Sequence, residues 1–172
     1  LENTGVPKLE MRERVDEAME RLGVAHLRSR PPHELSDGEK HRVAIAGVLA
    51  MDPEVLVLDE PTSHLDPRSA MELMHTISRL QKKTGITILI VEHRLEYSSS
   101  IANRLVVMDK GKIVSAGSVR EILAANEPFD LGVAIPPLAR LHKVLEENGI
   151  GLGQIPITPK EFIHNVREKL ND

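Results

Sequence analysis

The sequence contains no cysteine and no tryptophan, and aromatic residues make up only 2% of its 172 positions. Without cysteine there are no disulfides, no thiolate metal sites and no cysteine nucleophile. The scarcity of aromatic rings argues against a surface that stacks single-stranded nucleic acid. The formal net charge at pH 7 is −4, so no basic field attracts nucleic acid either. We therefore expect no nucleic-acid partner.

Long apolar runs are also missing. The longest, residues 43–51 and 86–91, are far too short to cross a bilayer. Hydrophobic residues make up 41% and charged residues 28%, an ordinary globular composition, and the length allows a real core. Composition thus excludes several classes of protein, and local motifs have to indicate the function.

The glycine-rich loop that commonly cradles nucleotide phosphates is absent from the sequence. That loop reads G-x-x-x-x-G-K-[ST], and its backbone N–H groups and lysine hold the phosphates. Of the 11 glycines only Gly111 precedes a lysine, and Ile113 follows that lysine. The segment GIGLGQ, residues 149–154, misses the dinucleotide pattern G-x-G-x-x-G because Gln154 takes its last position. A nucleotide site in this protein would need its phosphate cradle from elsewhere.

Hydrophobic patterning predicts a βαβ unit in the first half of the chain. Residues 55–58 and 86–91 are short continuous apolar runs, typical of strands buried on both faces of a parallel sheet. Between them, Asp66 and Pro67 form a strong helix start, and an apolar stripe continues to Gly85. The crossover between the two strands should be right-handed.

Other elements follow from the same patterns. Helices are predicted over about residues 8–22, 36–50, 118–125, 137–147 and 158–170, and a hairpin over 105–115. We divide the chain into a helical subdomain (1–52), a core part (53–126) and a C-terminal helical appendage (127–172).

Two adjacent carboxylates follow the first predicted strand. In VLVLDEPTSHLD, residues 55–66, an apolar strand leads into Asp59 and Glu60. Ligands bind beyond the carboxyl ends of strands in a parallel α/β sheet. A hydrophobic strand that ends in aspartate is the Walker B pattern, whose carboxylate holds the Mg²⁺ of a nucleoside triphosphate. The alternative is that the two acids only begin a turn before Pro61.

Two further motifs place polar groups at element ends. In LSDGE, residues 35–39, Ser36 and Glu39 have the S-x-x-E spacing of a capping box. A helix N-terminus with free N–H groups also binds anions, and the two interpretations are compatible. His93 lies two positions beyond the second predicted strand and is a candidate to hydrogen-bond a phosphate. A lone histidine at a strand end is more often structural.

Together, in this order and with short spacers, the motifs resemble those of ABC transporter ATPase subunits. LSDGE is similar to the signature motif, VLVLDE to Walker B, SHLD to the D-loop and the histidine of VEH to the switch histidine, over roughly residues 9–123. VAIAGVLAM, VEHRLE and the helical tail look most like the energy-coupling-factor branch, the cobalt, nickel and vitamin importers. The resemblance implies an α/β P-loop NTPase fold, a parallel sheet with flanking helices, incomplete at its N-terminus, with a small C-terminal helical appendage.

The resemblance also implies roles for single residues. Asp59 would bind Mg²⁺, Glu60 would act as general base or orient water, and His93 would contact the γ-phosphate of ATP. The signature residues would contact ATP bound to the opposite subunit, and the D-loop would lie in the subunit interface. These two sets are Ser36, Asp37, Gly38 and Glu39, and Ser63, His64, Leu65 and Asp66.

The motifs depart from the family pattern at three positions. The usual signature is LSGGQ, so Asp37 replaces a glycine and Glu39 a glutamine, and His64 replaces the usual D-loop alanine. At the helix N-terminus each acid is attracted by the helix dipole and stabilises the helix by about 0.3–1 kcal/mol. The same charges repel a bound phosphate by about 1–4 kcal/mol, depending on distance and exposure. We expect the contact in trans to be weakened rather than abolished.

The resemblance implies an ATP- and Mg²⁺-dependent motor subunit of a membrane importer for a metal ion or vitamin. It would pair with a second ATPase subunit, identical or different, and with transmembrane subunits, on the cytoplasmic face of the membrane. We expect these residues to be the C-terminal portion of that subunit, to bind ATP weakly alone and not to hydrolyse it. Without the P-loop strand the sheet should also associate through its open edge. The alternatives are a non-catalytic regulatory or truncated ABC fragment and a soluble ABC-type ATPase.

Overall fold

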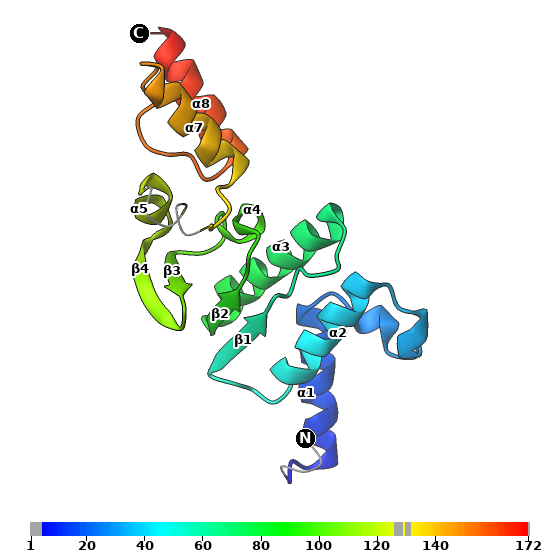
Figure 1. Ribbon diagram of the computed structural model, residues 1–172. Coiled ribbons are helices and arrows are strands. Elements are labelled where there is room, and N and C mark those ends of the chain that lie inside the picture. Colours follow the sequence, from blue (N-terminus) through cyan, green and yellow to red (C-terminus); the bar gives the residue numbers. More distant parts are fainter. Residues whose placement is uncertain (1–4, 126–128, 130–131, 172) are drawn as a thin grey trace. The chain divides into compact units, whose positions relative to one another are not determined.

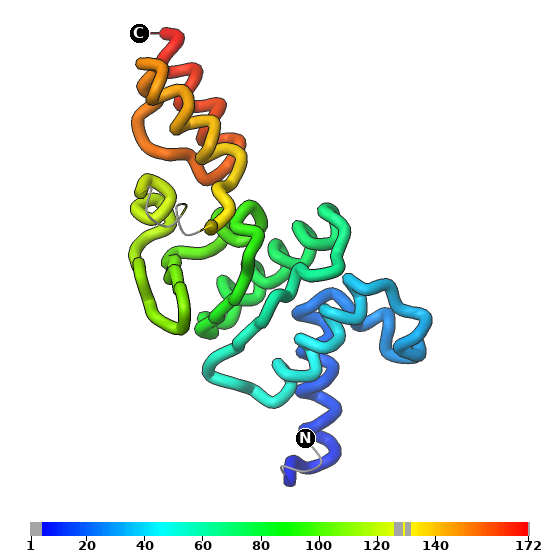
Figure 2. Tube along the Cα trace, in the orientation of Figure 1, coloured from blue at the N-terminus to red at the C-terminus, as the bar shows by residue number. Residues whose placement is uncertain are grey.

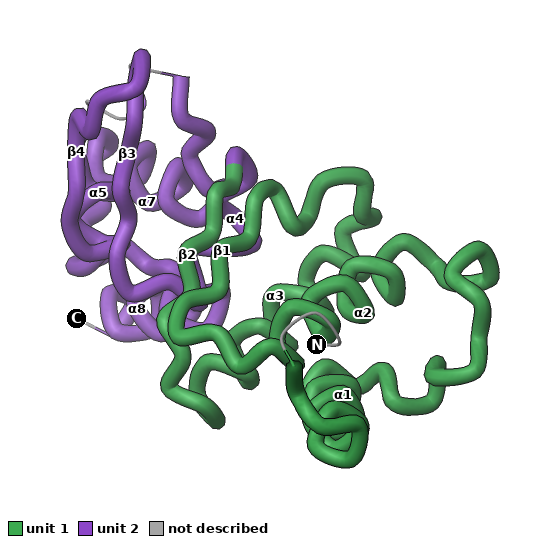
Figure 3. The backbone as a smooth tube through the Cα atoms, turned by 90° about the horizontal axis from the view of Figure 1, so that it is seen from below, with its two compact units in different colours: residues 1–92 green, residues 93–172 purple. Residues whose placement is uncertain are grey.

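The computed structural model describes residues 5–125, 129 and 132–171 (Figure 1). The chain divides into two compact units, residues 1–92 and 93–172 (Figure 3). The predicted division at residue 52 falls inside the first unit, and the one at 126 lies outside the described residues; both stay predictions. Among the residues described, no helix is both long and apolar enough to span a bilayer.

Unit 1 begins with two helices that contact each other, α1 (Lys8–Arg21) and α2 (Asp37–Leu49). Two short 3-10 turns, η2 (Ala25–Leu27) and η3 (Pro32–Glu34), lie between them. The predicted capping box at the start of α2 is confirmed, because Ser36 Oγ accepts a hydrogen bond from the Glu39 N–H and the Glu39 carboxylate accepts one from the Ser36 N–H. The local sequence thus determines where α2 begins.

The predicted βαβ unit is confirmed. Strands β1 (Val55–Asp59) and β2 (Thr87–Val91) pair in parallel, with Val55 opposite Thr87 and Asp59 opposite Val91. Helix α3 (Pro67–Thr84) connects them, and the Asp66 side chain caps it by accepting hydrogen bonds from the N–H groups of Arg68 and Ser69. Gly85 ends the helix at a φ of 70°, a left-handed conformation that suits glycine.

Only one face of this strand pair is buried. Leu56 is 1% exposed and faces the core, whereas its neighbour Val57 is 58% exposed and Leu89 on β2 is 54% exposed. Helix α3 lies against one face of the pair (Figures 1 and 3). Its buried apolar residues are Ala70, Leu73, Met74, Ile77 and Leu80. The prediction that both faces are buried is therefore wrong for the described residues, because no element among them covers the second face.

In its described residues, unit 2 contains a hairpin and four helices. Helix α4 (Leu95–Ser98) precedes the antiparallel strands β3 (Arg104–Asp109) and β4 (Lys112–Ser118), and α5 (Val119–Ala124) follows them. The chain then continues to α7 (Pro137–Glu147) and α8 (Pro159–Asn171), as the trace in Figure 2 shows. Hydrophobic residues from α4, α5, α7 and the segment before α8 form its core: Leu95, Val119, Leu123, Ala139 and Ile155. The predicted hairpin and terminal helices are confirmed.

Candidate functional site

The two acids lie where β1 ends, and the backbone turns directly after the first of them. Asp59 is the last residue of the strand, and the N–H of Glu60 donates to the carbonyl of Val91 on β2 at 2.9 Å. Glu60 has a φ of 46°, so the alternation of strand side chains stops at this residue. Both carboxylates are exposed. Neighbouring residues of a strand point to opposite faces of the sheet, but Asp59 and Glu60 are not bound by that rule because the chain turns between them. A ligand beyond this end of the parallel pair can therefore contact both carboxylates.

The segment after the acids is a compact turn that leads into α3. The N–H of Ser63 donates to the Glu60 carbonyl at 3.0 Å, and His64 has a φ of 62°. His64 is exposed, Ser63 is partly exposed and Leu65 is buried in the core. Hydrogen bonds from Ser69 hold the pKa of Asp66 below its ordinary value, so its carboxylate is ionised while it caps α3. In this turn Leu65 and Asp66 are held by the fold, whereas His64 is the residue presented outward.

Sequence reasoning missed a residue that supports this turn, Glu92. The buried Thr62, 0% exposed, donates its backbone N–H to Glu92 Oε1 at 3.0 Å, and its hydroxyl donates to the same oxygen. One carboxylate oxygen at the end of β2 thus anchors the turn that follows β1. The signal was available in the VEH triplet, because Glu92 follows its strand as directly as Glu60 follows Asp59.

The signature residues form the exposed first turn of α2. Ser36 and Asp37 are exposed, whereas Gly38 is buried, and a Cβ added there would lie 3.5 Å from the Cβ of Ser69. Hydrogen bonds from the Ser36 N–H and hydroxyl hold the pKa of Glu39 below its ordinary value. Lys40 pairs with Asp37 at 3.1 Å and offsets one of the two negative charges. Gly38 therefore lies on the side of this turn that faces Ser69 of α3, and the solvent side of the turn carries the cap.

His93 is exposed and is the first residue of unit 2. It lies two residues beyond Val91, the strand partner of Asp59. Its convergence with the two acids stays a prediction.

A magnesium site at Asp59 would rest on one carboxylate from this chain. Within the described part of the chain, no group of three or more His, Cys, Asp or Glu side chains could hold a metal ion. Mg²⁺ commonly keeps several waters and binds through one or two carboxylates together with substrate phosphates. The exposed carboxylate of Asp59 at a strand end fits that mode, in which nucleotide and water complete the coordination.

Comparisons with known proteins agree on one relationship. A family model described as ABC transporter matches residues 1–63. The chain is 42% identical over 151 residues to the energy-coupling factor transporter ATP-binding protein EcfA of Methanoculleus marisnigri, covering 87% of this chain and 54% of that protein. It is 42% identical over 165 residues to EcfA1 of Clostridium novyi, covering 95% of this chain and 58% of that protein.

Solved structures give the same result. CbiO1 from Clostridium perfringens, described as part of the ABC transporter complex cbiONQ, matches with a TM-score of 0.67 and 40% identity over 80% of this chain and 55% of that one. A nucleotide-free ATP-binding cassette from an ABC transporter matches with a TM-score of 0.66 and 30% identity, over 73% of this chain and 51% of that one. The chain therefore spans little more than half the length of these relatives.

Proposed function

Because this chain belongs to the ABC transporter ATP-binding family, we propose that it forms part of the ATP-hydrolysing motor subunit of a membrane importer. The family and its P-loop NTPase fold were both expected from the motifs, and the comparisons confirm them. The activity is proposed for the assembled subunit. Within this chain, the acids at the end of β1 supply the catalytic groups.

The observation that carries this proposal is the geometry at the end of β1. A parallel strand ends on Asp59, and the backbone then enters a left-handed conformation at Glu60. Asp59 would hold Mg²⁺, which would neutralise phosphate charge, and Glu60 would take a proton from the attacking water or orient it. His93 contacts the γ-phosphate from the end of β2. The γ-phosphate of the bound nucleotide is then the electrophile. The chain supplies a metal ligand (Asp59), a base (Glu60) and a contact to the phosphate (His93).

The signature and D-loop residues act across a subunit interface in this proposal. The first turn of α2, which contains the exposed Ser36 and the buried Gly38, faces ATP held by the opposite subunit. Asp37 and Glu39 lie beside them in the same turn and weaken that contact through their charge. His64, exposed at its positive φ, lies in the interface, while Asp66 keeps the turn attached to α3.

The phosphate cradle comes from outside these residues, because none of the 11 glycines belongs to a P-loop pattern. We therefore propose that the chain alone binds Mg-ATP very weakly and that activity needs a P-loop-bearing portion. The partners are a second ATPase subunit and transmembrane subunits, with the assembly at the inner face of the membrane. The motif resemblance to the energy-coupling-factor branch, the branch for which these relatives are named, is our reason to propose a metal-ion or vitamin importer.

The test is ATP turnover after a P-loop-bearing N-terminal portion of a relative is joined to this chain. We expect Glu60→Gln to lower turnover at least about 100-fold, because the water loses its base, while Mg-ATP stays bound. Glu72→Gln is the matched control, since Glu72 is an exposed acid of unit 1 that pairs with Arg68 at 3.0 Å in helix α3. Wild-type turnover in the Glu60 variant would remove Glu60 from the mechanism.

The missing P-loop also favours a second candidate, a non-catalytic ABC fragment that acts as a regulator. The joined protein separates the two. If it binds Mg-ATP but does not hydrolyse it even with Glu60 intact, the regulatory role is the better account.

A further inference from the structure

Glu60 has a backbone conformation that is unfavourable for a residue with a side chain. Its φ of 46° lies in the left-handed region, which residues other than glycine seldom adopt. Such strain persists only where surrounding contacts hold the chain in place, and it is concentrated at functional sites. The contacts that hold the turn after β1 therefore also determine where the carboxylate of Glu60 points.

Two consecutive residues at the end of β2 supply acceptors to this turn. The carbonyl of Val91 accepts the N–H of Glu60 at 2.9 Å. The carboxylate of the next residue, Glu92, accepts the N–H of Thr62 at 3.0 Å and the Thr62 hydroxyl through the same oxygen. Thr62 is completely buried. The end of β2 thus fixes the backbone on both sides of Pro61.

The hydrogen bonds within the turn start from the same two residues. The N–H of Ser63 donates to the Glu60 carbonyl at 3.0 Å, and the N–H of the buried Leu65 donates to the Thr62 carbonyl at 3.2 Å. Thr62 therefore joins the turn to β2 on one side and to the core on the other. Loss of the Glu92 carboxylate would remove two of the bonds that hold the turn against β2, and Glu60 would leave its left-handed conformation more easily.

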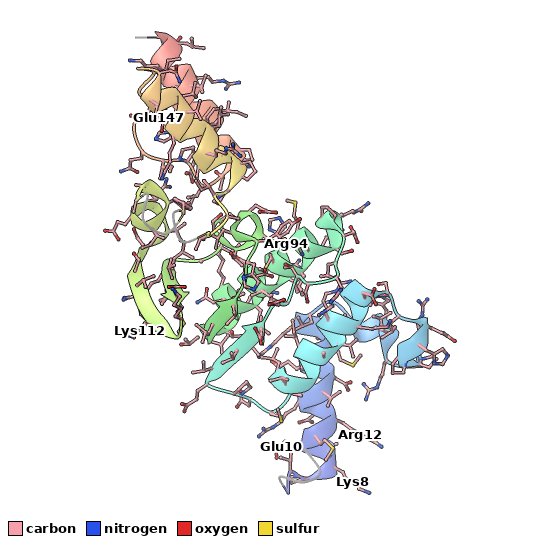
Figure 4. All side chains as sticks on the ribbon, in the orientation of Figure 1. Lys8, Glu10, Arg12, Arg94, Lys112 and Glu147 are labelled. Atoms are coloured by element: carbon pink, nitrogen blue, oxygen red, sulfur yellow. The ribbon has the colours of Figure 1, made fainter. Side chains whose placement is uncertain are left out.

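Glu92 also precedes the proposed phosphate contact. A carboxylate that accepts two hydrogen bonds is a firm anchor, because bonds to an ionised acceptor are stronger than those between neutral groups. The chain continues through His93 to Arg94, which is labelled in Figure 4 and whose guanidinium carbon lies 4.8 Å from the centre of the Tyr97 ring. The residues before and after His93 are thus each held by a contact within their own unit.

We propose that Glu92 is a positioning residue for ATP hydrolysis. Through Thr62 it holds Glu60 in the left-handed conformation that directs the Glu60 carboxylate to the attacking water. It acts through that contact and not by touching the nucleotide. This inference rests on the proposed function, in which Glu60 is the base, and adds a residue that sets the rate of the chemical step rather than the affinity for nucleotide.

The kinetics of the protein joined to a P-loop-bearing portion test this role. Glu92→Ala should lower kcat at least about tenfold and change the KM for Mg-ATP by no more than about twofold, because the base is misplaced while the nucleotide contacts remain. Glu92→Gln keeps an oxygen acceptor for Thr62 and should retain at least about half of kcat. In a Glu60→Gln background, Glu92→Ala should cause no further loss, because the base is already absent.

Thr76→Val is the matched control for Thr62→Val. Thr76 is also a buried threonine of unit 1, and its hydroxyl donates to the Glu72 carbonyl at 2.9 Å within α3. Thr62→Val, which keeps the N–H bond to Glu92, should lower kcat about threefold, whereas Thr76→Val should leave it unchanged. If Glu92→Ala does not fold, this pair of variants decides.

Amide hydrogen exchange on the 172-residue chain measures the same contact without ATP. The Glu60 amide should exchange at least about tenfold faster in Glu92→Ala than in the wild type, and no more than about twofold faster in Thr76→Val. Equal exchange of the Glu60 amide in wild type and Glu92→Ala would overturn the proposal, because Glu92 would then not hold the turn.

The kinetic outcomes separate this inference from the proposed function. If Glu60→Gln abolishes turnover but Glu92→Ala keeps wild-type kcat, the inference fails and the proposed function stands. Loss of kcat in Glu92→Gln, an equal loss in Thr76→Val and Thr62→Val, or a further loss from Glu92→Ala in the Glu60→Gln background would also overturn it. If the joined wild type hydrolyses no ATP, or Glu60→Gln retains wild-type turnover, the proposed function fails and the inference fails with it.

Discussion

Units 1 and 2 each begin a helix with a serine–glutamate capping box, and the surroundings of the two boxes differ. The Ser36 N–H donates to the Glu39 carboxylate at 2.8 Å, and the Ser118 N–H donates to the Glu121 carboxylate at 2.7 Å. In unit 2 the residue after the cap, Val119, is buried in the core. In unit 1 the corresponding residue is an exposed aspartate. The same capping motif is therefore followed by a buried core residue in unit 2 and by an exposed residue in unit 1.

Exposed apolar strand residues occur in both units. Val57 and Leu89 are exposed on β1 and β2, and Met108 and Ile113 are exposed on the hairpin of unit 2, whose helices pack around a shared cluster. A surface that is apolar and uncovered favours association with another element. Strands of both units therefore offer apolar surface to partner elements, and the difference between the two capping boxes shows that a capping box alone does not mark a phosphate site.

The largest stability difference should separate the two faces of β1. Leu56→Ala should cost about 2–5 kcal/mol in the free energy of unfolding, because it removes buried methyl groups and leaves a cavity. Val57→Ala, on the exposed face, should change it by no more than about 0.5 kcal/mol. Leu123→Ala serves as the comparison in unit 2, where Leu123 is buried, and should resemble Leu56→Ala. Urea unfolding of the chain measures all three.

A cost near that of Leu56→Ala for Val57→Ala would mean that the second face is covered in solution. Light scattering would then show whether a second copy covers it, as expected if the open strand pair associates.

The next largest effect should come from the anchor of the turn after β1. Glu92→Ala removes the carboxylate oxygen that accepts two hydrogen bonds from the buried Thr62. We expect a loss of about 1–3 kcal/mol in the free energy of unfolding. A double-mutant cycle with Thr62→Val isolates the pair. Independent effects of the two substitutions would show that Glu92 acts through other contacts.

The two boxes should contribute similarly to stability and differently to function. Ser36→Ala and Ser118→Ala should each lower the free energy of unfolding by about 0.5–2 kcal/mol, the usual loss for a helix cap. In the protein joined to a P-loop portion, only Ser36→Ala should also slow ATP turnover. Equal turnover in the two variants would mean that the first turn of α2 has only a structural role.

Acid titration should give the smallest difference between the two units. The carboxyl pKa should be shifted in the same direction at both capping boxes. Hydrogen bonds from the capping serines hold the folded-state pKa of Glu39 and of Glu121 below the ordinary value of 4.5. A lowered carboxyl pKa adds stability above the unfolded value, and that stability is lost as pH falls through the folded value. NMR titration of the two side chains measures it. An ordinary value at Glu39 alone would show that the first turn of α2 frays.

Local signals in the sequence were sufficient to predict the helix starts and the βαβ unit. Capping residues such as Ser36 and Asp66 act within three positions, and periodicity reports burial along a single element. The exposed face of β1 was not predictable, because an apolar run carries no information about which partner elements are present. The bond between Thr62 and Glu92 joins residues 30 positions apart, and only the pairing of β1 with β2 brings them together.

The positions of Asp59 and Glu60 were easier to predict, because the end of a strand fixes where its next residues lie.

We propose that Asp59, Glu60 and His93 serve a triphosphate whose phosphate cradle is supplied by residues other than these 172. Calorimetry with Mg-ATP, on the chain alone and on the chain joined to a P-loop-bearing portion, tests it most directly. We predict no saturation below about 1 mM for the chain alone and saturable binding for the joined protein. Micromolar affinity of the chain alone would contradict the claim, because these residues would then hold the phosphates themselves.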